Sequence, residues 1–126
     1  MIPITPKEIL WINYCLARGK GSPRGVDEVK LLKAALLRPK SSFAGKDLYP
    51  DIYTKAASLS EFIMKGRPFK SANTSTAVAA GLLLLQKNGI KIQGAEGELT
   101  GLNRNLPSNT AGLQEWANCF KSLTMQ

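Results

Sequence analysis

The residues best suited to chemistry lie in one ten-residue stretch, residues 67–76, with the sequence RPFKSANTST. It lies between an amphipathic segment, residues 52–64, and a strongly apolar one, residues 77–85. This pattern predicts a loop that leads into the N-terminus of a buried helix, where unpaired backbone N–H groups form a site for an anion. The candidate phosphate- or nucleotide-binding residues are Lys70, Ser71, Ala72, Asn73, Thr74 and Ser75, with the cation Arg67 beside them.

A purely structural interpretation of the same stretch is equally open. In that interpretation Asn73 and Thr76 only cap the helix, while Pro68 and Phe69 pack the loop against the core. The sequence alone does not decide between the two interpretations.

The chain contains no histidine, which excludes Ser-His, Cys-His and His-metal mechanisms. Its two cysteines, Cys15 and Cys119, are isolated and lack the spacing of a metal site, so no metal centre is expected. We expect both to be buried or half-buried free thiols, and a disulfide between the two terminal helices is the alternative.

Composition indicates one globular domain over residues 1–126, with 44% hydrophobic and 21% charged residues. The net charge of +8 comes from Lys and Arg residues spread from Lys7 to Lys121, with no run of three and no interleaved aromatic residues. A solvated basic surface explains it best, an acidic partner or a phosphate ligand comes next, and nucleic-acid binding is not expected. No apolar run approaches the ~20 residues of a membrane span and no signal peptide is recognisable, so we expect a cytoplasmic protein that binds no membrane.

The pattern of apolar residues, caps and breakers predicts an all-α chain. A capping box at Thr5 opens a first helix that carries Trp11 as a core or rim residue. Asp27 is expected to cap a second helix with Val29 on its buried side. An irregular stretch or hairpin at residues 40–50 follows, and then helices at about 51–64, 74–87 and 113–123. At most one short helix is expected near residues 96–102.

The stretch at residues 67–76 resembles the signature of the Fic/Doc (Fido) family, His-Pro-Phe-x-Asp/Asn-Gly/Ala-Asn-Lys-Arg-Thr. Further landmarks resemble death-on-curing (Doc) toxins of that family: ITPKEI (4–9), RP (38–39), FxG (43–45), YP (49–50), KAA (55–57) and LLLLQKNG (82–89). The similarity becomes weak after about residue 95. It implies an all-α Fido-fold helical bundle around a central buried helix, with a short flap that binds the target; here Arg38, Phe43 and Gly45 are the flap candidates.

The resemblance also implies transfer of an adenylyl or phosphoryl group from a nucleotide to a protein hydroxyl, for which this chain lacks the side chains. Arg67 stands at the position of the catalytic histidine and stays protonated, so it cannot act as a base. Ser71 replaces the acidic residue that helps to place Mg²⁺, so Mg²⁺ binding is expected to be weakened or absent. Thr74 and Ser75 replace the Lys-Arg pair on the phosphates.

We therefore expect a Doc-like toxin–antitoxin family protein without catalytic activity, a pseudoenzyme. It would bind a protein partner, or ATP or another nucleotide, at the loop before the central helix. The partners that the resemblance implies are a small antitoxin-like protein or a translation-factor-like target. The alternative is a phosphoryl- or adenylyl-transferase with rearranged catalytic residues, for which Asp51 and Glu61 are the nearest acidic candidates.

Overall fold

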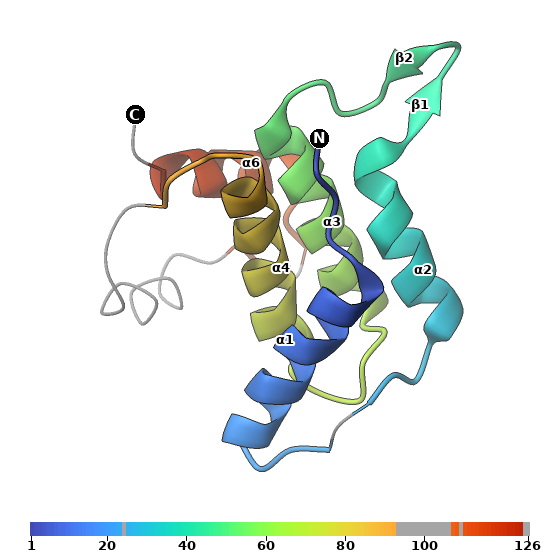
Figure 1. The fold of residues 1–126 in the computed structure, drawn as a ribbon, viewed down its shortest axis with the longest axis vertical. Helices are drawn as coiled ribbons and strands as arrows, with labels where there is room; N and C mark the ends of the chain where they lie inside the picture. The colour runs from blue at the N-terminus through green and yellow to red at the C-terminus, as the bar shows by residue number, and fades with distance from the viewer. Residues whose placement is uncertain (24, 93–106, 109, 125–126) are drawn as a thin grey trace.

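The computed structural model describes residues 1–23, 25–92, 107–108 and 110–124, and it is mostly helical (Figure 1). Its described elements are α1 (Pro6–Gly19), α2 (Val29–Leu37), the 3₁₀ helix η1 (Arg38–Lys40), β1 (Ser42–Phe43), β2 (Lys46–Asp47), α3 (Ile52–Gly66), α4 (Asn73–Lys87) and α6 (Leu113–Ser122). The predicted all-α architecture with a short flap is confirmed. The short helix expected at residues 96–102 lies outside the described residues.

Helix α4 is the central element, as the apolar pattern of residues 77–85 predicts. It runs beside α3, while α6 lies across their upper ends and α1 crosses their lower half (Figure 1). Nine of its residues are buried: Asn73, Thr76, Ala77, Val78, Ala80, Gly81, Leu82, Leu84 and Leu85. Apolar side chains on several sides of one helix find partners only when other helices surround it, which fixes the bundle.

The helix boundaries follow the local signals of the sequence. Thr5 and Glu8 form the predicted capping box at the start of α1. The Asp51 side chain accepts a hydrogen bond from the backbone N–H of Thr54 and so caps α3. At the end of α4 the chain turns at Asn88 and Gly89, with φ +87° at the glycine.

Three expectations for side-chain positions near the N-terminus are wrong. Trp11 is 65% exposed, because α1 packs through Ile9, Asn13 and Ala17, and a residue two positions from Ile9 lies roughly 200° around the helix. Val29 is 53% exposed and belongs to a run of exposed residues, 27–30, at the start of α2. Cys15 is exposed rather than buried, since it too lies away from the face that packs on α4.

The expected cap of α2 is also wrong. The N-cap is Glu28, without a capping hydrogen bond from its side chain, and Asp27 lies one position earlier. The backbone N–H groups of Asp27 and Glu28 both donate to the carbonyl of Pro68, at 2.9 and 3.0 Å. The start of α2 is thus fixed by the loop of residues 67–76. Cys15 and Cys119 are both free thiols, and Cys119 is half-buried.

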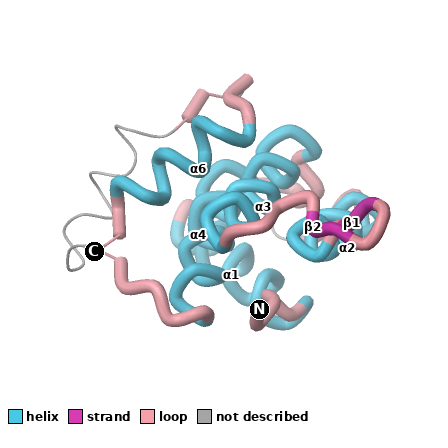
Figure 2. Tube along the Cα trace, turned by 90° about the horizontal axis from the view of Figure 1, so that it is seen from above, coloured by secondary structure: helices cyan, strands magenta, loops and turns pink. Residues whose placement is uncertain are grey.

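The hairpin after η1 projects beyond the helices at the upper right of Figure 1, and in the view from above its strands are drawn over α2 (Figure 2). Phe43 pairs with Lys46 and Ser42 with Asp47, so Ala44 and Gly45 form a two-residue turn. Both turn residues have positive φ, 52° and 78°, as a type I′ turn requires. Across the described parts of the chain, no helix is both long and apolar enough to cross a bilayer.

Candidate functional site

The connection from α3 to α4, residues 67–72, begins and ends at a residue in the left-handed backbone conformation. Arg67, the C-cap of α3, has φ 49°, and its N–H donates to the carbonyl of Ile63 at 2.9 Å. Ala72, the N-cap of α4, has φ 58°. Two such turns within six residues reverse the chain from α3 into α4. They place the motif at the lower ends of the two helices in Figure 1.

The side chain of Asn73 points into the loop and closes it. Its Oδ1 accepts from the backbone N–H of Phe69 at 2.9 Å, and its Nδ2 donates to the carbonyl of Phe69 at 2.9 Å. Both residues are buried, with exposed fractions of 3% for Asn73 and 2% for Phe69. This amide therefore shapes the loop, in line with the structural interpretation of Asn73, although it does so by bonding to Phe69 rather than as an N-cap.

A buried residue of α1, Asn13, holds the loop from its inner side. Its Nδ2 lies 3.0 Å from the carbonyl of Ser71 and 3.1 Å from Oγ1 of Thr76. Thr76 is fully buried and belongs to the first turn of α4, so this single amide joins α1 to both the loop and the helix. The sequence analysis missed Asn13; its position on the same face as Ile9 and Ala17 is the signal that could have found it.

The connection between α1 and α2 covers the outer side of the loop. Besides the two hydrogen bonds to Pro68, the N–H of Lys70 donates to the carbonyl of Gly25 at 2.9 Å. The hydroxyl of Ser71 donates to the carbonyl of Pro23. Phe69 also forms an isolated antiparallel bridge with Val26. The backbone of the motif is thus held between this connection and Asn13.

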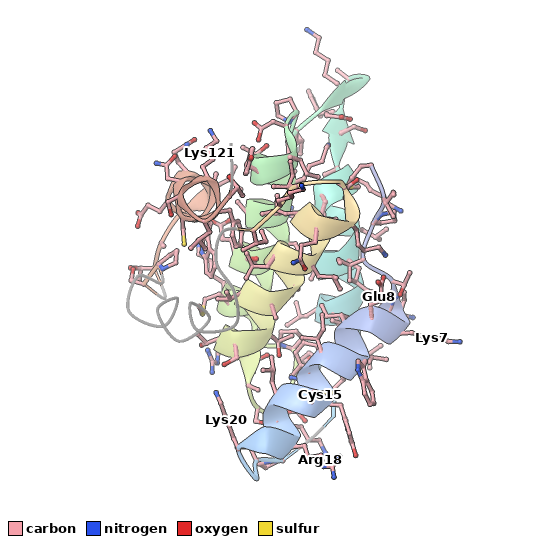
Figure 3. All side chains as sticks on the ribbon, turned by 60° about the vertical axis from the view of Figure 1, so that its left-hand side comes forward. Lys7, Glu8, Cys15, Arg18, Lys20 and Lys121 are labelled. Atoms are coloured by element: carbon pink, nitrogen blue, oxygen red, sulfur yellow. The ribbon has the colours of Figure 1, made fainter. Side chains whose placement is uncertain are left out.

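The hydroxyls of the first turn of α4 contact neighbouring helices. Oγ of Ser75 accepts from the ammonium of Lys20, the C-cap residue of α1, at 3.0 Å. Figure 3 shows the Lys20 side chain directed to the opposite side of α1 from that of Arg18. Oγ1 of Thr74 lies 3.5 Å from Sδ of Met64. Lys20 therefore brings a cation to the N-terminus of α4, and the sequence analysis missed it because it is distant in sequence.

These contacts define what the loop offers a ligand. It carries the cations Arg67 and Lys70, and α1 adds Lys20. Ser71, at the motif position of a metal-binding acid, is a neutral oxygen whose proton is donated to Pro23, so the residues present do not fit Mg²⁺. Within the described parts of the chain, no cluster of three or more His, Cys, Asp or Glu residues is placed to hold a metal ion.

The flap candidates lie apart from the loop, on η1 and the hairpin. The guanidinium of Arg38 lies over the rings of Tyr49 and Phe62, 5.9 and 5.6 Å from their centroids. Phe43 is 76% exposed, and Gly45 completes the turn. Arg38 thus anchors the base of the hairpin by cation–π contacts, while Phe43 is presented to solvent.

Comparison with known proteins decides the family. A family model described as the Fic/DOC family matches residues 3–85, which include the loop and nearly all of α4. The chain belongs to the Fic/DOC family. It is also similar to Toxin Doc of Mycolicibacterium smegmatis (strain ATCC 700084 / mc(2)155), with 33% identity over 72 residues. That alignment spans 57% of this chain and 55% of the toxin, little more than half the length of each.

Membership of the Fic/DOC family confirms the expected resemblance and fold. The loop of residues 67–76 and helix α4 both lie inside the matched range except for the last residues of the helix. In this Fic/DOC protein the six candidate nucleotide-binding residues are consecutive in the loop and the first turn of α4. Their side chains contact several different neighbours, and binding of a nucleotide there stays a prediction.

Proposed function

We propose that this Fic/DOC protein is a toxin–antitoxin family member that transfers no nucleotide or phosphoryl group and acts by binding a protein partner. The observation that carries the proposal is Arg67 at the motif position of the catalytic base. A guanidinium stays protonated at every relevant pH and cannot accept the proton of a target hydroxyl. A general base contributes roughly 10²–10⁴ in rate, so its loss alone removes most turnover.

The two acidic residues that the sequence suggested as replacements for this base, Asp51 and Glu61, have other partners. Asp51 caps the opposite end of α3, fifteen positions before Gly66 next to the loop, or about 22 Å along the helix axis. The carboxylate of Glu61 lies 3.6 Å from the ammonium of Lys65 on the same helix. Both carboxylates are engaged by these other partners, which argues against the alternative of a transferase with rearranged residues.

The proposed partner class follows from the relative and from the charge. The similar protein carries the name Toxin Doc, and the resemblance to Doc toxins implies an antitoxin partner. We therefore propose a small antitoxin-like protein as the partner of this chain, and a translation-factor-like protein as the second candidate. The net charge of +8 favours an acidic partner in either case.

The test is a transfer assay with γ- and α-labelled ATP and the purified chain, using total bacterial protein as acceptor. We expect no label above background from the wild type or from Arg67→His, because the restored imidazole would still lack the metal and phosphate ligands. Arg67→Ala is the matched control for a change at that position. Robust transfer by the wild type, or its rescue by Arg67→His alone, would contradict the proposal.

A second candidate function, phosphate binding without chemistry, is favoured by Lys20. Its ammonium lies at the N-terminal turn of α4, where the helix dipole already favours an anion. Titration of ATP and GTP into the chain by calorimetry, with and without Mg²⁺, tests it. Binding that Lys20→Met and Lys70→Met each weaken, and that Lys30→Met leaves unchanged, would support it. No heat at millimolar nucleotide would rule it out.

A further inference from the structure

The face of α1 directed away from α4 carries a row of large side chains that are partly exposed to solvent. Leu10, Trp11 and Tyr14 are 44%, 65% and 38% exposed, and together with Lys7 and Arg18 they line one shallow surface hollow. Opposite this row, α1 packs on α4 through Ile9, Asn13 and Ala17. The helix therefore has a second side with apolar side chains, and this side is partly exposed to solvent. We call the five residues of the row the α1 stripe.

The spacing of the stripe is that of a helix-packing surface. Lys7, Trp11, Tyr14 and Arg18 follow one another at intervals of four, three and four residues. This is the 3.5-residue period with which one helix presents a straight seam to another. Leu10 lies beside the seam on the same face. A helix laid along α1 would meet these side chains in register over about three turns.

The charged residues of the α1 stripe, Lys7 and Arg18, indicate an acidic partner. They lie at the two ends of the stripe, eleven positions or about 16 Å apart along the helix axis, and point away from the bundle (Figure 3). Glu8, the acidic residue of α1, is held on another side by the ammonium of Lys87. Because the stripe carries cations and no carboxylate, a second copy of this basic chain would bring like charges together, whereas an acidic surface would be attracted.

We propose that the α1 stripe binds an α-helix of an acidic protein, with apolar residues against Leu10, Trp11 and Tyr14 and carboxylates reaching Lys7 and Arg18. The aromatic geometry favours a helix over single-stranded nucleic acid. The rings of Trp11 and Tyr14 lie 5.7 Å apart with planes 17° from parallel, so they stack on each other and not as separate platforms for bases. This surface is separate from the loop of residues 67–76, and the proposal rests on the proposed function, to whose acidic protein partner it assigns a surface.

The experiment is a selection of displayed 18-residue helical peptides on the full chain, with depletion on the double variant Trp11→Ala/Tyr14→Ala. We expect enriched peptides that place apolar residues on one face and Asp or Glu toward both ends. The best peptide is then synthesised and titrated by calorimetry. Binding should weaken about tenfold or more in Trp11→Ala/Tyr14→Ala and in Lys7→Glu/Arg18→Glu, since aromatic and arginine side chains dominate interfaces of this kind.

The matched control is Lys30→Glu/Lys33→Glu, which makes the same change of charge at two exposed residues of α2 and should leave binding within about twofold. Cys15 gives a second readout because it is an exposed thiol on α1 next to the stripe. Burial raises the pKa of the half-buried Cys119, which leaves Cys15 the faster thiol to react with a disulfide reagent. The bound peptide should slow the reaction of Cys15 and leave that of Cys119 unchanged.

Several outcomes would overturn the proposal. One is a selection that enriches no peptide, or enriches basic ones. Another is peptide binding that the stripe variants do not weaken. The third is binding of a 20-nucleotide single strand or of phosphatidylserine vesicles that depends on Trp11 while no peptide binds. Since the substituted side chains are exposed, circular dichroism is expected to show that all variants fold.

Discussion

At the scale of single residues, the loop of residues 67–76 holds non-glycine residues in a conformation that L-amino acids disfavour. Arg67 and Ala72 both have positive φ, 49° and 58°. A left-handed non-glycine residue costs about 1–2 kcal/mol, which the surrounding hydrogen bonds must offset. Histidine is among the residues enriched in this conformation, so the backbone at position 67 fits both the family residue and the arginine that replaces it.

Replacement of Ala72 by glycine should therefore stabilise the protein. Glycine adopts positive φ without a steric penalty, and after its greater freedom in the unfolded chain is subtracted we expect Ala72→Gly to raise the free energy of unfolding by about 1 kcal/mol. Urea denaturation measures it. Ala77→Gly, in the interior of α4 with ordinary helical backbone, is the control and should destabilise the protein. A loss of stability in Ala72→Gly would show that the left-handed turn is not strained.

Asn13 is the polar residue on which the loop most depends. Truncation to alanine leaves the carbonyl of Ser71 and the hydroxyl of Thr76 without this partner in a buried position. We expect Asn13→Ala to lower the free energy of unfolding by about 2 kcal/mol. Asn118→Ala removes an amide that bonds Gln114 on the exposed side of α6, and should cost less than about 0.5 kcal/mol. Equal losses in the two variants would mean that Asn13 does not organise the loop.

At the scale of elements, α4 approaches both α6 and α3 closely at Gly81. A methyl group at this position would overlap the ring of Phe120 and the hydroxyl of Ser60, which itself donates to the carbonyl of Ala77 at 2.6 Å. The three helices can pack this closely because residue 81 has no side chain.

Gly81→Ala should accordingly destabilise the protein by about 2 kcal/mol, because overpacking outweighs the better helix propensity of alanine. Gly19→Ala is the control, since a methyl group at the end of α1 meets nothing within 4 Å. We expect Gly19→Ala to be neutral or slightly stabilising. Thermal unfolding followed by circular dichroism measures both changes, and an unchanged melting temperature for Gly81→Ala would contradict the packing argument.

The same scale shows what the sequence could and could not predict. Helices with a strong local signal, such as the capping box at Thr5 and the cap at Asp51, are placed almost to the residue. The loop of residues 67–76 is predicted as well, because its breakers and hydroxyls stand between two apolar segments. The residues that support it were not predicted. They are Asn13, Lys20 and the connection at residues 23–28, which reach the loop through contacts 40 or more positions apart, on which local patterns carry no information.

The exposure of Trp11 was missed for a related reason. Periodicity identifies apolar faces of a helix, but α1 has two, and only tertiary packing decides which one meets α4. Aromatic residues interleaved with cations were also overlooked, because Lys7, Trp11, Tyr14 and Arg18 adjoin on the helix surface and not in sequence.

At the scale of the whole molecule, the N-terminal segment is held against the far end of the central helix. Asn88 exchanges two hydrogen bonds with the backbone of Ile2, at 2.6 and 2.9 Å. The ammonium of Lys87 contacts the carbonyl of Pro3 at 2.8 Å and the carboxylate of Glu8. The start of the chain therefore closes the bundle across more than eighty residues, and part of this closure is ionic.

That ionic part makes stability depend on acid pH. The hydrogen bond from Lys87, and then that from the backbone of Thr5, lower the pKa of Glu8 below its ordinary value of 4.5. A lowered folded-state pKa means that the stabilisation is complete above the unfolded value. It is lost as the pH falls through the folded value, where the carboxylate takes up its proton.

Glu8→Gln should remove this contribution, so the free energy of unfolding of the variant should fall less than that of the wild type as the pH is lowered. We expect the difference in unfolding free energy between wild type and Glu8→Gln to be largest near neutral pH and to shrink below the ordinary pKa of 4.5. Urea unfolding at a series of pH values measures it. Lys87→Met, which removes the main cause of the shift, should reduce this fall as well, whereas Glu115→Gln on the exposed side of α6 should not. A constant difference at all pH values would show that Glu8 acts only as the capping residue of α1, whose amide analogue retains the hydrogen bond to Thr5.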